Sequence, residues 1–337
     1  MADLSTDYLG LRLKNPVIAG ASVLTLKMET VKRIEEEGAA ALVVSSLFEE
    51  QVQLEKFRLE EGLEKIKYRY PEMIELFPEI EHAGPAEHLM WVKRVKESVK
   101  IPVIASLNAV NKSTWIEYAK KLEETGVDAL ELNFYYTPSG FDKTGSQVEE
   151  EQIEVLKEIK SQVKIPVSVK LSFFYSNPLN FMKRIDEAGA DGIVIFNKLF
   201  QPDIDIDKEE HIAPFNLSNE GDGRLSLRFA GLLYNSINAG ICANTGIHKY
   251  EDLVKMILAG ANCVQVVSTL IRNGISQLGR LIKGLETWME EKGYTRIEDF
   301  RGKLSKLNTK DSFVYARAQY VKLLLRSDLV LRNFPTV

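Results

Sequence analysis

The residues that could do chemistry in this sequence follow short apolar runs, each with the composition of a buried strand. They are rich in amides, hydroxyls and small side chains, and they include one lysine inside a run but no pair of carboxylates. Carboxyl ends of parallel strands meet at one edge of a sheet or barrel, so these residues are predicted to share one site. The set is Gly20, Ser45, Asn108, Asn133, Lys170, Asn197, Asn244, Thr245, Gly246, Ser268 and Thr269.

Lys170 lies within the run SVKLSF. An ammonium group in a buried strand must find a partner or lose its proton. Three interpretations remain open at this stage. The lysine could contact an electron-rich heterocycle, act as a Schiff-base nucleophile, or belong to a structural ion pair.

Asn108, Asn133 and Asn197 follow three different runs. Each amide offers both donors and an acceptor, which a ring that carries carbonyl and N–H groups needs. A structural hydrogen bond would explain any one of them equally well, but the three together favour a heterocyclic ligand.

Two segments near the end of the chain have the composition of a phosphate site. Asn244-Thr245-Gly246 and Ser268-Thr269 follow the last two runs. Backbone N–H groups of such loops, with a helix N-terminus behind them, commonly bind phosphate in barrel proteins. The alternative is that Gly246 only turns the chain and that the hydroxyls cap a helix.

The apolar runs recur in a regular context that predicts the architecture. Phrases such as EEEGAAALVVSS and DEAGADGIVIF join a helix end, a glycine and an apolar run, as expected for strands buried on both faces of a parallel sheet. The predicted strands are 17–20, 41–45, 103–107, 129–132, 167–171, 192–196, 241–243 and 263–267. Eight such units, with no G-x-G-x-x-G after the first, favour an α/β fold of the TIM (β/α)8 barrel type over an open sheet.

Several segments lie outside this repeat. The N-terminus alternates and predicts a hairpin, while residues 47–84 and 198–224 form long connections after strands 2 and 6, the second with a hairpin pattern. A helix is predicted over about residues 310–325. We therefore expect a barrel domain over 1–305 and a C-terminal helical extension over 306–337, packed on the barrel or at a subunit interface, and a homodimer is left open.

Composition limits the function classes. The 337-residue chain is 45% hydrophobic and 27% charged, with a net charge of −5, which argues against nucleic-acid binding. No signal pattern and no apolar run of membrane-spanning length stands out, so a cytoplasmic protein without a membrane partner is predicted. Cys242 and Cys263 lie in apolar runs, and the four histidines have no metal spacing, so no metal site is expected.

These motifs resemble those of the dihydroorotate dehydrogenases, in particular the soluble branch of that family. The resemblance rests on LSTDYLGLRLKNPVIAGAS, VDALELN, VSVKLS, GADGIVIFN, AGANCVQVVSTLIRNG and EEKGYTRIEDFRGKL, and it covers about residues 4–305. It implies an FMN-dependent barrel oxidoreductase that acts on a CH–CH bond of a small-molecule substrate, in pyrimidine biosynthesis for the family's namesake.

The resemblance also implies roles for particular residues. Lys170 corresponds to the lysine beside the flavin ring, where a cation stabilises reduced FMN. Ser45, Asn108, Asn133 and Asn197 correspond to contacts of the isoalloxazine or the substrate. Gly223, Asn244, Thr245, Gly246, Ser268 and Thr269 fall on the phosphate side, and Ala19 and Gly20 follow the first strand beside the cofactor.

This sequence departs from the family after the fourth strand. The family reads Asn-Leu-Ser-x-Pro-Asn there, and its soluble branch carries a catalytic cysteine within that loop, whereas this chain has Asn133-Phe134-Tyr135-Tyr136-Thr137-Pro138. Tyr136 stands at the cysteine position. A tyrosine is a poor general base near neutral pH, although it can donate a proton or stack on a flat ligand.

Four hypotheses follow. The first is an FMN-dependent oxidoreductase that transfers a hydride between flavin N5 and a small substrate, with a pyrimidine-like ring among the candidates, supported by Lys170 and by Tyr135 or Tyr136 as acid or substrate contact. The second is a genuine dihydroorotate dehydrogenase in which a hydroxyl such as Ser139, or a water molecule, replaces the cysteine. The others are a Schiff-base lyase and a non-catalytic flavin-binding subunit.

Overall fold

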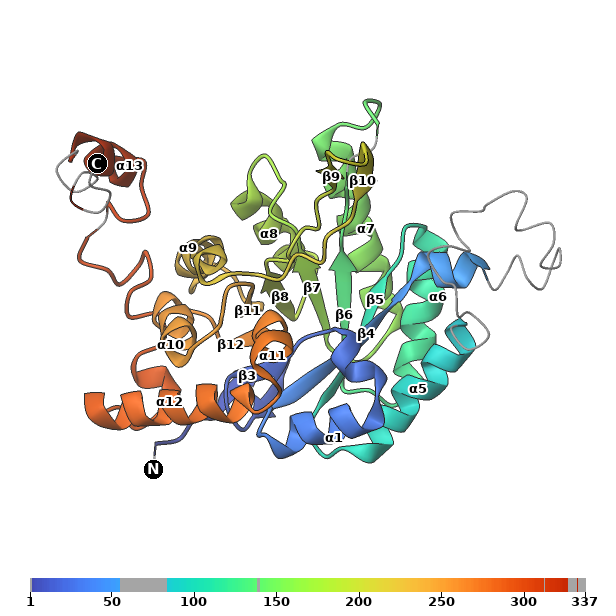
Figure 1. Cartoon of the computed structure of the whole chain (residues 1–337), viewed down its shortest axis with the longest axis horizontal. Helices are drawn as coiled ribbons and strands as arrows, with labels where there is room; N and C mark the ends of the chain where they lie inside the picture. Colours follow the sequence, from blue (N-terminus) through green and yellow to red (C-terminus); the bar gives the residue numbers. More distant parts are fainter. Residues whose placement is uncertain (1, 55–83, 138–139, 312, 327–331, 333–337) are drawn as a thin grey trace.

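The computed structural model describes residues 2–54, 84–137, 140–311, 313–326 and 332, and its centre is a closed barrel of eight parallel strands (Figure 1). Each strand pairs with its neighbour in sequence order and the last pairs with the first, so the predicted (β/α)8 barrel is confirmed. The barrel strands are β3 (Val17–Ala19), β4 (Ala41–Phe48), β5 (Val103–Asn108), β6 (Ala129–Phe134), β7 (Val167–Leu171), β8 (Gly192–Ile195), β11 (Gly240–Asn244) and β12 (Cys263–Val266).

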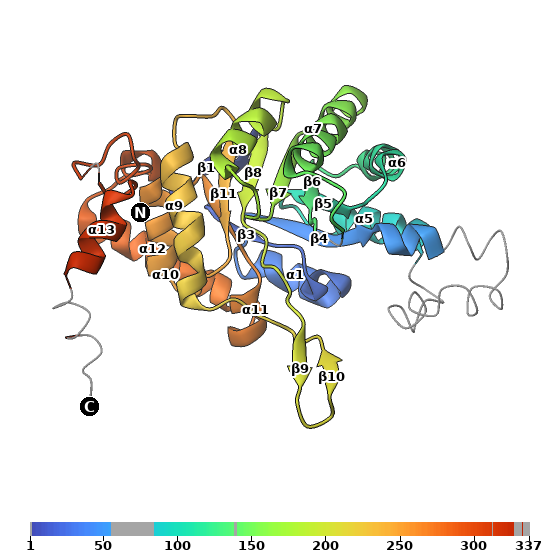
Figure 2. The same cartoon turned by 90° about the horizontal axis from the view of Figure 1, so that it is seen from above.

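Helices surround the barrel and cover the outer face of its strands (Figures 1 and 2). Several of them end at a glycine, as the sequence predicts. Gly38 follows α1 with φ of 97° and Gly189 follows α8 with φ of 96°, a conformation that costs other residues free energy. The described helices around the barrel are α1 (Met28–Glu36), α5 (Pro85–Ser98), α6 (Lys112–Glu123), α7 (Gly145–Gln162), α8 (Pro178–Glu187), α9 (Gly223–Leu233), α10 (Tyr250–Ala259), α11 (Ser268–Asn273) and α12 (Gln277–Lys292), with short 3-10 turns η1 (Val23–Leu26), η3 (Glu220–Asp222) and η4 (Ile297–Asp299).

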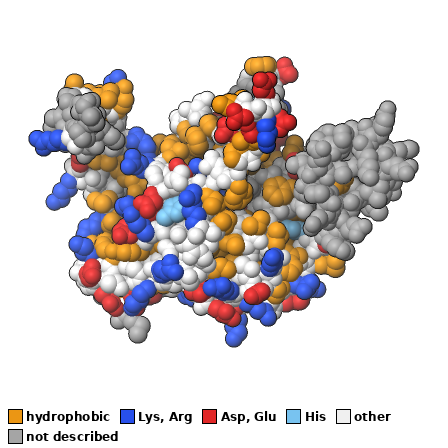
Figure 3. Space-filling view, viewed as in Figure 1, with side chains coloured by type: hydrophobic (Ala, Val, Ile, Leu, Met, Phe, Trp, Pro, Cys, Tyr) orange, Lys and Arg blue, Asp and Glu red, His pale blue; other side chains and the backbone are white. Residues whose placement is uncertain are grey.

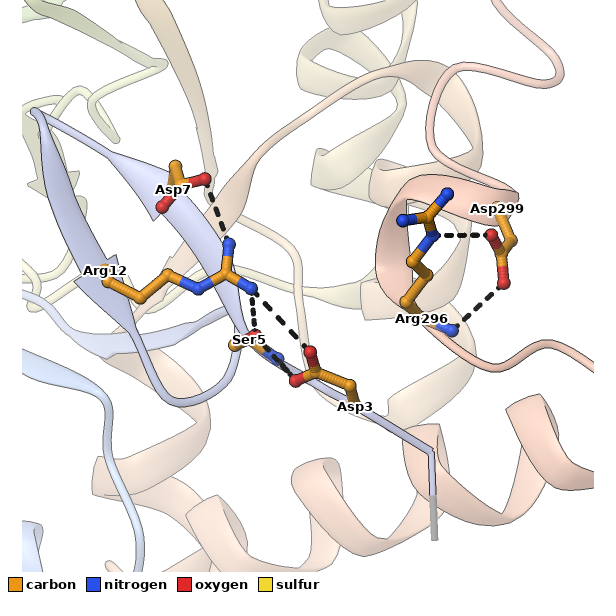
Figure 4. Close-up of polar contacts among 6 residues, drawn as sticks. All are labelled: Asp3, Ser5, Asp7, Arg12, Arg296 and Asp299. Atoms are coloured by element: carbon orange, nitrogen blue, oxygen red, sulfur yellow. Dashed lines mark hydrogen bonds and ion pairs between the residues drawn. The ribbon is translucent and has the colours of Figure 1, made fainter.

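The predicted N-terminal hairpin is confirmed as β1 (Thr6–Tyr8) and β2 (Leu11–Leu13), and it closes the barrel at the amino ends of the strands. Tyr8 is buried against the first residues of β8 and β11, where a Cβ at Gly192 or Gly240 would come within 2.8 Å of the tyrosine side chain. Arg12 contacts Asp7 on the paired strand at 3.0 Å, and it ties the hairpin to the preceding Asp3 at 3.7 Å (Figure 4). The β1–β2 hairpin is therefore a plug at the amino ends of the strands, and a ligand site can form at their carboxyl ends.

Two connections leave the barrel after β4 and β8. Strand β4 runs to Phe48, three residues beyond the predicted strand, with a shift in its register against β5 between Val44 and Leu47. Of the long connection that follows, residues 55–83 lie outside the described residues. The predicted hairpin after strand 6 of the barrel is confirmed as β9 (Asp203–Asp205) and β10 (Glu210–Ile212), which project from the barrel (Figure 2).

The C-terminal helix α13 (Ala318–Leu325) begins later than the predicted start near residue 310. Tyr315 accounts for the difference, because its hydroxyl donates to Leu304 O at 2.7 Å and its carbonyl accepts from Arg228 at 2.8 Å, which anchors this part of the chain in a non-helical path. None of the residues of α13 is buried. The division into a barrel domain and an extension that packs on it or on another subunit stays a prediction.

Candidate active site

A cavity of about 610 Å³ lies at the carboxyl ends of the barrel strands, a size typical of small-molecule sites. Ten of the candidate residues from the sequence line it, although they come from segments up to 223 positions apart (45 to 268). They are Ser45, Asn108, Asn133, Tyr135, Lys170, Asn197, Asn244, Thr245, Gly246 and Ser268. The expectation that strand ends converge on one cavity is therefore met for these residues.

The barrel interior explains why polar residues gather there. Side chains of a strand alternate between the two faces, so every second residue points into the barrel. Near the hairpin plug the inward residues are apolar and form one buried cluster, which includes Ile18, Val43, Ile104, Ala129, Val194, Cys242 and Cys263. One step nearer the carboxyl ends the inward residues are polar, as at Ser106, Glu131, Lys170 and Gln265. The apolar layer supports the polar one and separates it from the hairpin plug.

Lys170 belongs to a buried polar group of three side chains. Its Nζ lies 3.7 Å from Glu131 Oε1 and 3.5 Å from Gln265 Oε1, and Gln265 Nε2 donates to Glu131 Oε2. Lys170 is 5% exposed and Glu131 is fully buried. Because the carboxylate and the amide hold the ammonium group, Lys170 is a fixed cation at the floor of the cavity.

The sequence reasoning did not identify Glu131 and Gln265. Glu131 lies two residues before Asn133, and Gln265 lies two residues after Cys263, so the two-residue period of a strand turns both inward. A polar residue in an inward position of an apolar run was the available signal.

The three candidate asparagines form a connected set beside this cation. Asn197 Nδ2 donates to Asn133 Oδ1 at 2.8 Å, and Asn108 Nδ2 donates to the backbone oxygen of Asn133 at 3.2 Å. All three also line the cavity, so their remaining donors and acceptors can face a ligand. This set can bind the polar edge of a planar heterocycle.

The far end of the cavity is built from hydroxyls and close-packed backbone. Gly246 has φ of 75°, and a Cβ there would lie 2.1 Å from Gly223 N, so a side chain at Gly246 would collide with the start of α9. Gly246 N donates to Ser218 Oγ at 3.2 Å, and Ser218 N donates to Ser268 Oγ at 3.0 Å. Small residues and hydroxyls in this arrangement can bind a phosphate group.

Other candidate residues do not line the cavity. Ala19 faces the outer core, while Gly20 packs against Val267, where a Cβ would come within 2.8 Å of the valine side chain. Gly223 lies behind Gly246, and Thr269 is buried and donates to His248 O at 3.2 Å. These residues shape the cavity from behind.

The two tyrosines after β6 point to different places. Tyr135 lines the cavity, and its hydroxyl oxygen accepts a hydrogen bond from Phe200 N at 3.1 Å. Tyr136 lines a separate cavity of about 150 Å³ together with Lys143, Ser172 and Tyr175. Consecutive residues in an extended segment face opposite sides, which accounts for this separation. Pro138 and Ser139 lie outside the described residues.

Aromatic residues that the sequence reasoning did not select form the mouth of the cavity. Phe200 and Phe215 flank the β9–β10 hairpin, with ring centroids 5.6 Å apart, and Phe48 comes from the end of β4. Lys198 also lines the cavity and contacts Asp222 at 2.7 Å. Burial opposes ionisation of Asp222, but Lys198 and backbone donors outweigh it and hold the pKa of this carboxyl below its ordinary value.

Among the described residues, no group of three or more His, Cys, Asp or Glu side chains could hold a metal ion. No helix in this part of the chain is long and apolar enough to cross a membrane. On the face drawn in Figure 3, Lys and Arg side chains are scattered among acidic and apolar ones.

The sequence of this chain is similar to those of known proteins over most of its length. A family model described as "Dihydroorotate dehydrogenase" matches residues 80–289. A relative from Thermoplasma volcanium, named "Dihydroorotate dehydrogenase B (NAD(+)), catalytic subunit", is 29% identical over 313 residues, which span 90% of this chain and 98% of the relative. A relative of the same name from Pyrococcus abyssi is 27% identical over 308 residues, which span 89% and 98% of the two chains.

Proposed function

This chain belongs to the dihydroorotate dehydrogenase family and is an oxidoreductase that acts on a CH–CH bond, and from that premise we propose that it uses FMN to oxidise or reduce a small molecule bound in the barrel cavity. The family is flavin-dependent in general. When bound, the flavin supplies hydride acceptance and donation at N5. The chain's own residues bind the cofactor, orient the substrate and provide charge.

The observation that carries the proposal is the buried Lys170, held at the cavity floor between Glu131 and Gln265. A fixed cation in a region with little water stabilises developing negative charge more than the same cation in water does. Lys170 on β7 pairs in register with Asn133 on β6, and Asn133 binds both other asparagines, so a ring recognised by the amides would lie close to this charge. Lys170 thus supports reduction of the cofactor.

The donor set at the other end suits the ribityl phosphate of FMN. Gly246 and Gly223 meet with no room for a Cβ, which lets backbone come close to a ligand. Asn244, Thr245 and Ser268 line this end of the cavity, and Thr269, behind it, supports Asn273 and His248 through hydrogen bonds. Ser45 and Asn108 also line the cavity and would contact the ring system, with Ala19 and Gly20 supporting it from behind.

Tyr135 is the proposed acid or substrate contact. Its oxygen accepts the hydrogen bond from Phe200 N, and its hydroxyl hydrogen donates to no acceptor among the described residues, so this hydrogen can donate to a substrate. Tyr136 would act only on a molecule that reaches the second cavity. Cys242 and Cys263 are buried in the apolar layer of the barrel, where burial raises the pKa of the Cys242 thiol, so neither serves as the base.

A second candidate is dihydroorotate dehydrogenase activity itself, in pyrimidine biosynthesis. The names of the relatives favour it. The same names describe catalytic subunits, which supports a partner subunit or a second copy of the chain as an assembly partner. We include in this proposal that the C-terminal extension, residues 306–337, contacts such a partner.

The two remaining hypotheses are weaker. A Schiff-base lyase needs Lys170 as a free amine, whereas Lys170 is ion-paired with Glu131, and the family is one of oxidoreductases. A flavin-binding subunit without turnover does not explain why Tyr135 lies beside the cation and the amides.

The decisive experiment is the visible absorption spectrum of protein purified with riboflavin phosphate, followed by a substrate screen in which bleaching of the flavin is measured. We expect a yellow protein with about one FMN per chain that dihydroorotate or another CH–CH donor reduces. A colourless protein without thermal protection by FMN would contradict the proposal. Trapping with borohydride would reveal a lyase.

A further inference from the structure

The charged groups of the cavity suggest what its substrate lacks. Within the described ranges, three charged side chains line the cavity, and two of them are lysines that already have carboxylate partners: Lys170 contacts Glu131 and Lys198 contacts Asp222. The third, Glu50, is acidic. Among the described residues, therefore, no lining cation remains for an anionic substrate, and Glu50 would repel one.

The apolar groups suggest what the substrate presents instead. Phe48, Phe200 and Phe215 line the cavity although they are 39%, 48% and 65% exposed. Val23 and Val110 are also exposed, and Leu217 and Ile271 are further apolar residues of the lining. Exposed apolar side chains that gather around one opening mark a binding surface, because burying them against a ligand is favourable.

Tyr135, Phe200 and Phe215 form an aromatic wall on one side of the cavity, and this wall is held in a defined position. The hydroxyl of Tyr135 fixes the backbone of Phe200, whose ring contacts that of Phe215 at a centroid distance of 5.6 Å. A wall that is anchored to the end of β6 offers flat surfaces at low entropic cost. These surfaces lie over the cavity that also contains the amides and Lys170.

We propose that the substrate of this oxidoreductase is a flat, uncharged molecule with carbonyl or N–H groups on its ring or beside it, and that it carries no carboxylate. The amides recognise its carbonyl and N–H groups, and the aromatic wall formed by Tyr135, Phe200 and Phe215 covers its face. This inference rests on the proposed function, because it assigns the substrate class of the same cavity.

The test compares ligands that differ in one charge. Orotate and methyl orotate share a ring, and so do cinnamate and methyl cinnamate, while the esters lack the negative charge. The FMN content of the protein is measured first by absorbance, so that a protein without FMN refutes the proposed function and not this inference. Binding to the FMN-loaded protein is then measured by calorimetry and by the change in the flavin spectrum.

We expect at least one ester to bind more tightly than its acid, by about tenfold or more, since an unpaired carboxylate would lose its hydration near Glu50. Tighter or equal binding of the acid in both pairs would overturn the proposal, and so would failure of both esters to bind.

A variant pair tests the wall itself. Phe215→Ala should weaken binding of the ester by about threefold to tenfold, the range for one aromatic contact. Phe313→Ala is the matched control, because Phe313 is 60% exposed and does not line the cavity. An unchanged affinity in Phe215→Ala, with the variant folded by circular dichroism, would contradict the role of the wall.

Discussion

Lys170 Nζ lies 3.7 Å from Glu131 Oε1, and both side chains point into the barrel from the neighbouring strands β7 and β6. The pair is almost completely buried, so each charge depends on the other. Gln265 from β12 bridges them across the interior, which links strands on opposite sides of the barrel. The ammonium group of Lys170 is thus held by two residues, Glu131 and Gln265, that lie far from it in the sequence.

Replacement of this lysine should separate its charge from its packing. Lys170→Met keeps most of the volume, and we expect the rate of flavin reduction by substrate to fall by about 100-fold or more, the effect of losing one preorganised charge. Stopped-flow absorbance measures this rate.

A control is needed because the single variant leaves Glu131 buried without its partner, which typically costs about 3–5 kcal/mol of stability. The double variant Glu131→Gln/Lys170→Met should recover stability without recovering the reduction rate. Recovery of the rate in the double variant would show that the lysine acts only on folding.

Gly246→Ala tests the close approach of the two loops at the proposed phosphate end. The new Cβ would lie 2.1 Å from Gly223 N, so the loops must separate and FMN should be lost. We expect retained flavin to fall at least tenfold, measured as absorbance per chain after desalting.

Gly293→Ala is the matched control, since Gly293 has φ of 73° but nothing within 4 Å of a new Cβ. Both variants carry the strain of a positive φ, which costs about 1 kcal/mol, and only Gly246→Ala adds the collision. Equal flavin content in the two variants would argue against the proposed phosphate end.

Glu49 connects the end of β4 to the start of α6 at the edge of the cavity. Its carboxylate accepts hydrogen bonds from Val110 N, Asn111 Nδ2 and Thr114 Oγ1. Burial opposes its ionisation, but hydrogen bonds from Asn111, Gln53 and Val110 outweigh burial and lower the pKa of Glu49.

Glu49→Gln should therefore destabilise the protein by about 1–3 kcal/mol, the range for charged hydrogen bonds, and weaken ligand binding through Val110. Urea denaturation and ligand titration measure the two effects. The exposed Glu29→Gln serves as the control and should change neither. A stable Glu49→Gln variant with normal binding would contradict this role.

His88 on α5 should make stability depend on pH. Its Nε2 atom is buried without a hydrogen-bond partner among the described residues, and burial lowers the pKa of His88 from 6.5 to about 4. Between these two pH values the unfolded chain binds more protons than the folded chain. The free energy of unfolding is therefore not reduced by His88 above pH 6.5, and it decreases as the pH falls toward 4.

The loss through His88 should reach up to about 3 kcal/mol at pH 4, and His88→Gln should remove this component. Urea midpoints between pH 4 and pH 7.5 measure it. If the urea midpoints of the wild type and of His88→Gln change equally with pH, His88 does not contribute to the pH dependence of stability.

The amino-acid sequence alone determined the barrel and much of its site. Alternation of helix ends, glycines and apolar runs predicted all eight strands, because strands buried on both faces need continuous apolar residues. The rule that strand ends converge also predicted that Lys170, Asn133 and Asn244 share a cavity, which the structure confirms.

Only the tertiary structure decided which groups contact one another. The partners of Lys170 come from β6 and β12, and their pairing depends on closure of the barrel, which no local pattern encodes. The opposite directions of Tyr135 and Tyr136 depend on the backbone path after β6, and the wall of Phe200 and Phe215 depends on the hairpin that follows β8. Short-range periodicity specifies strands and helices, whereas contacts across the barrel are set by how all eight strands pack together.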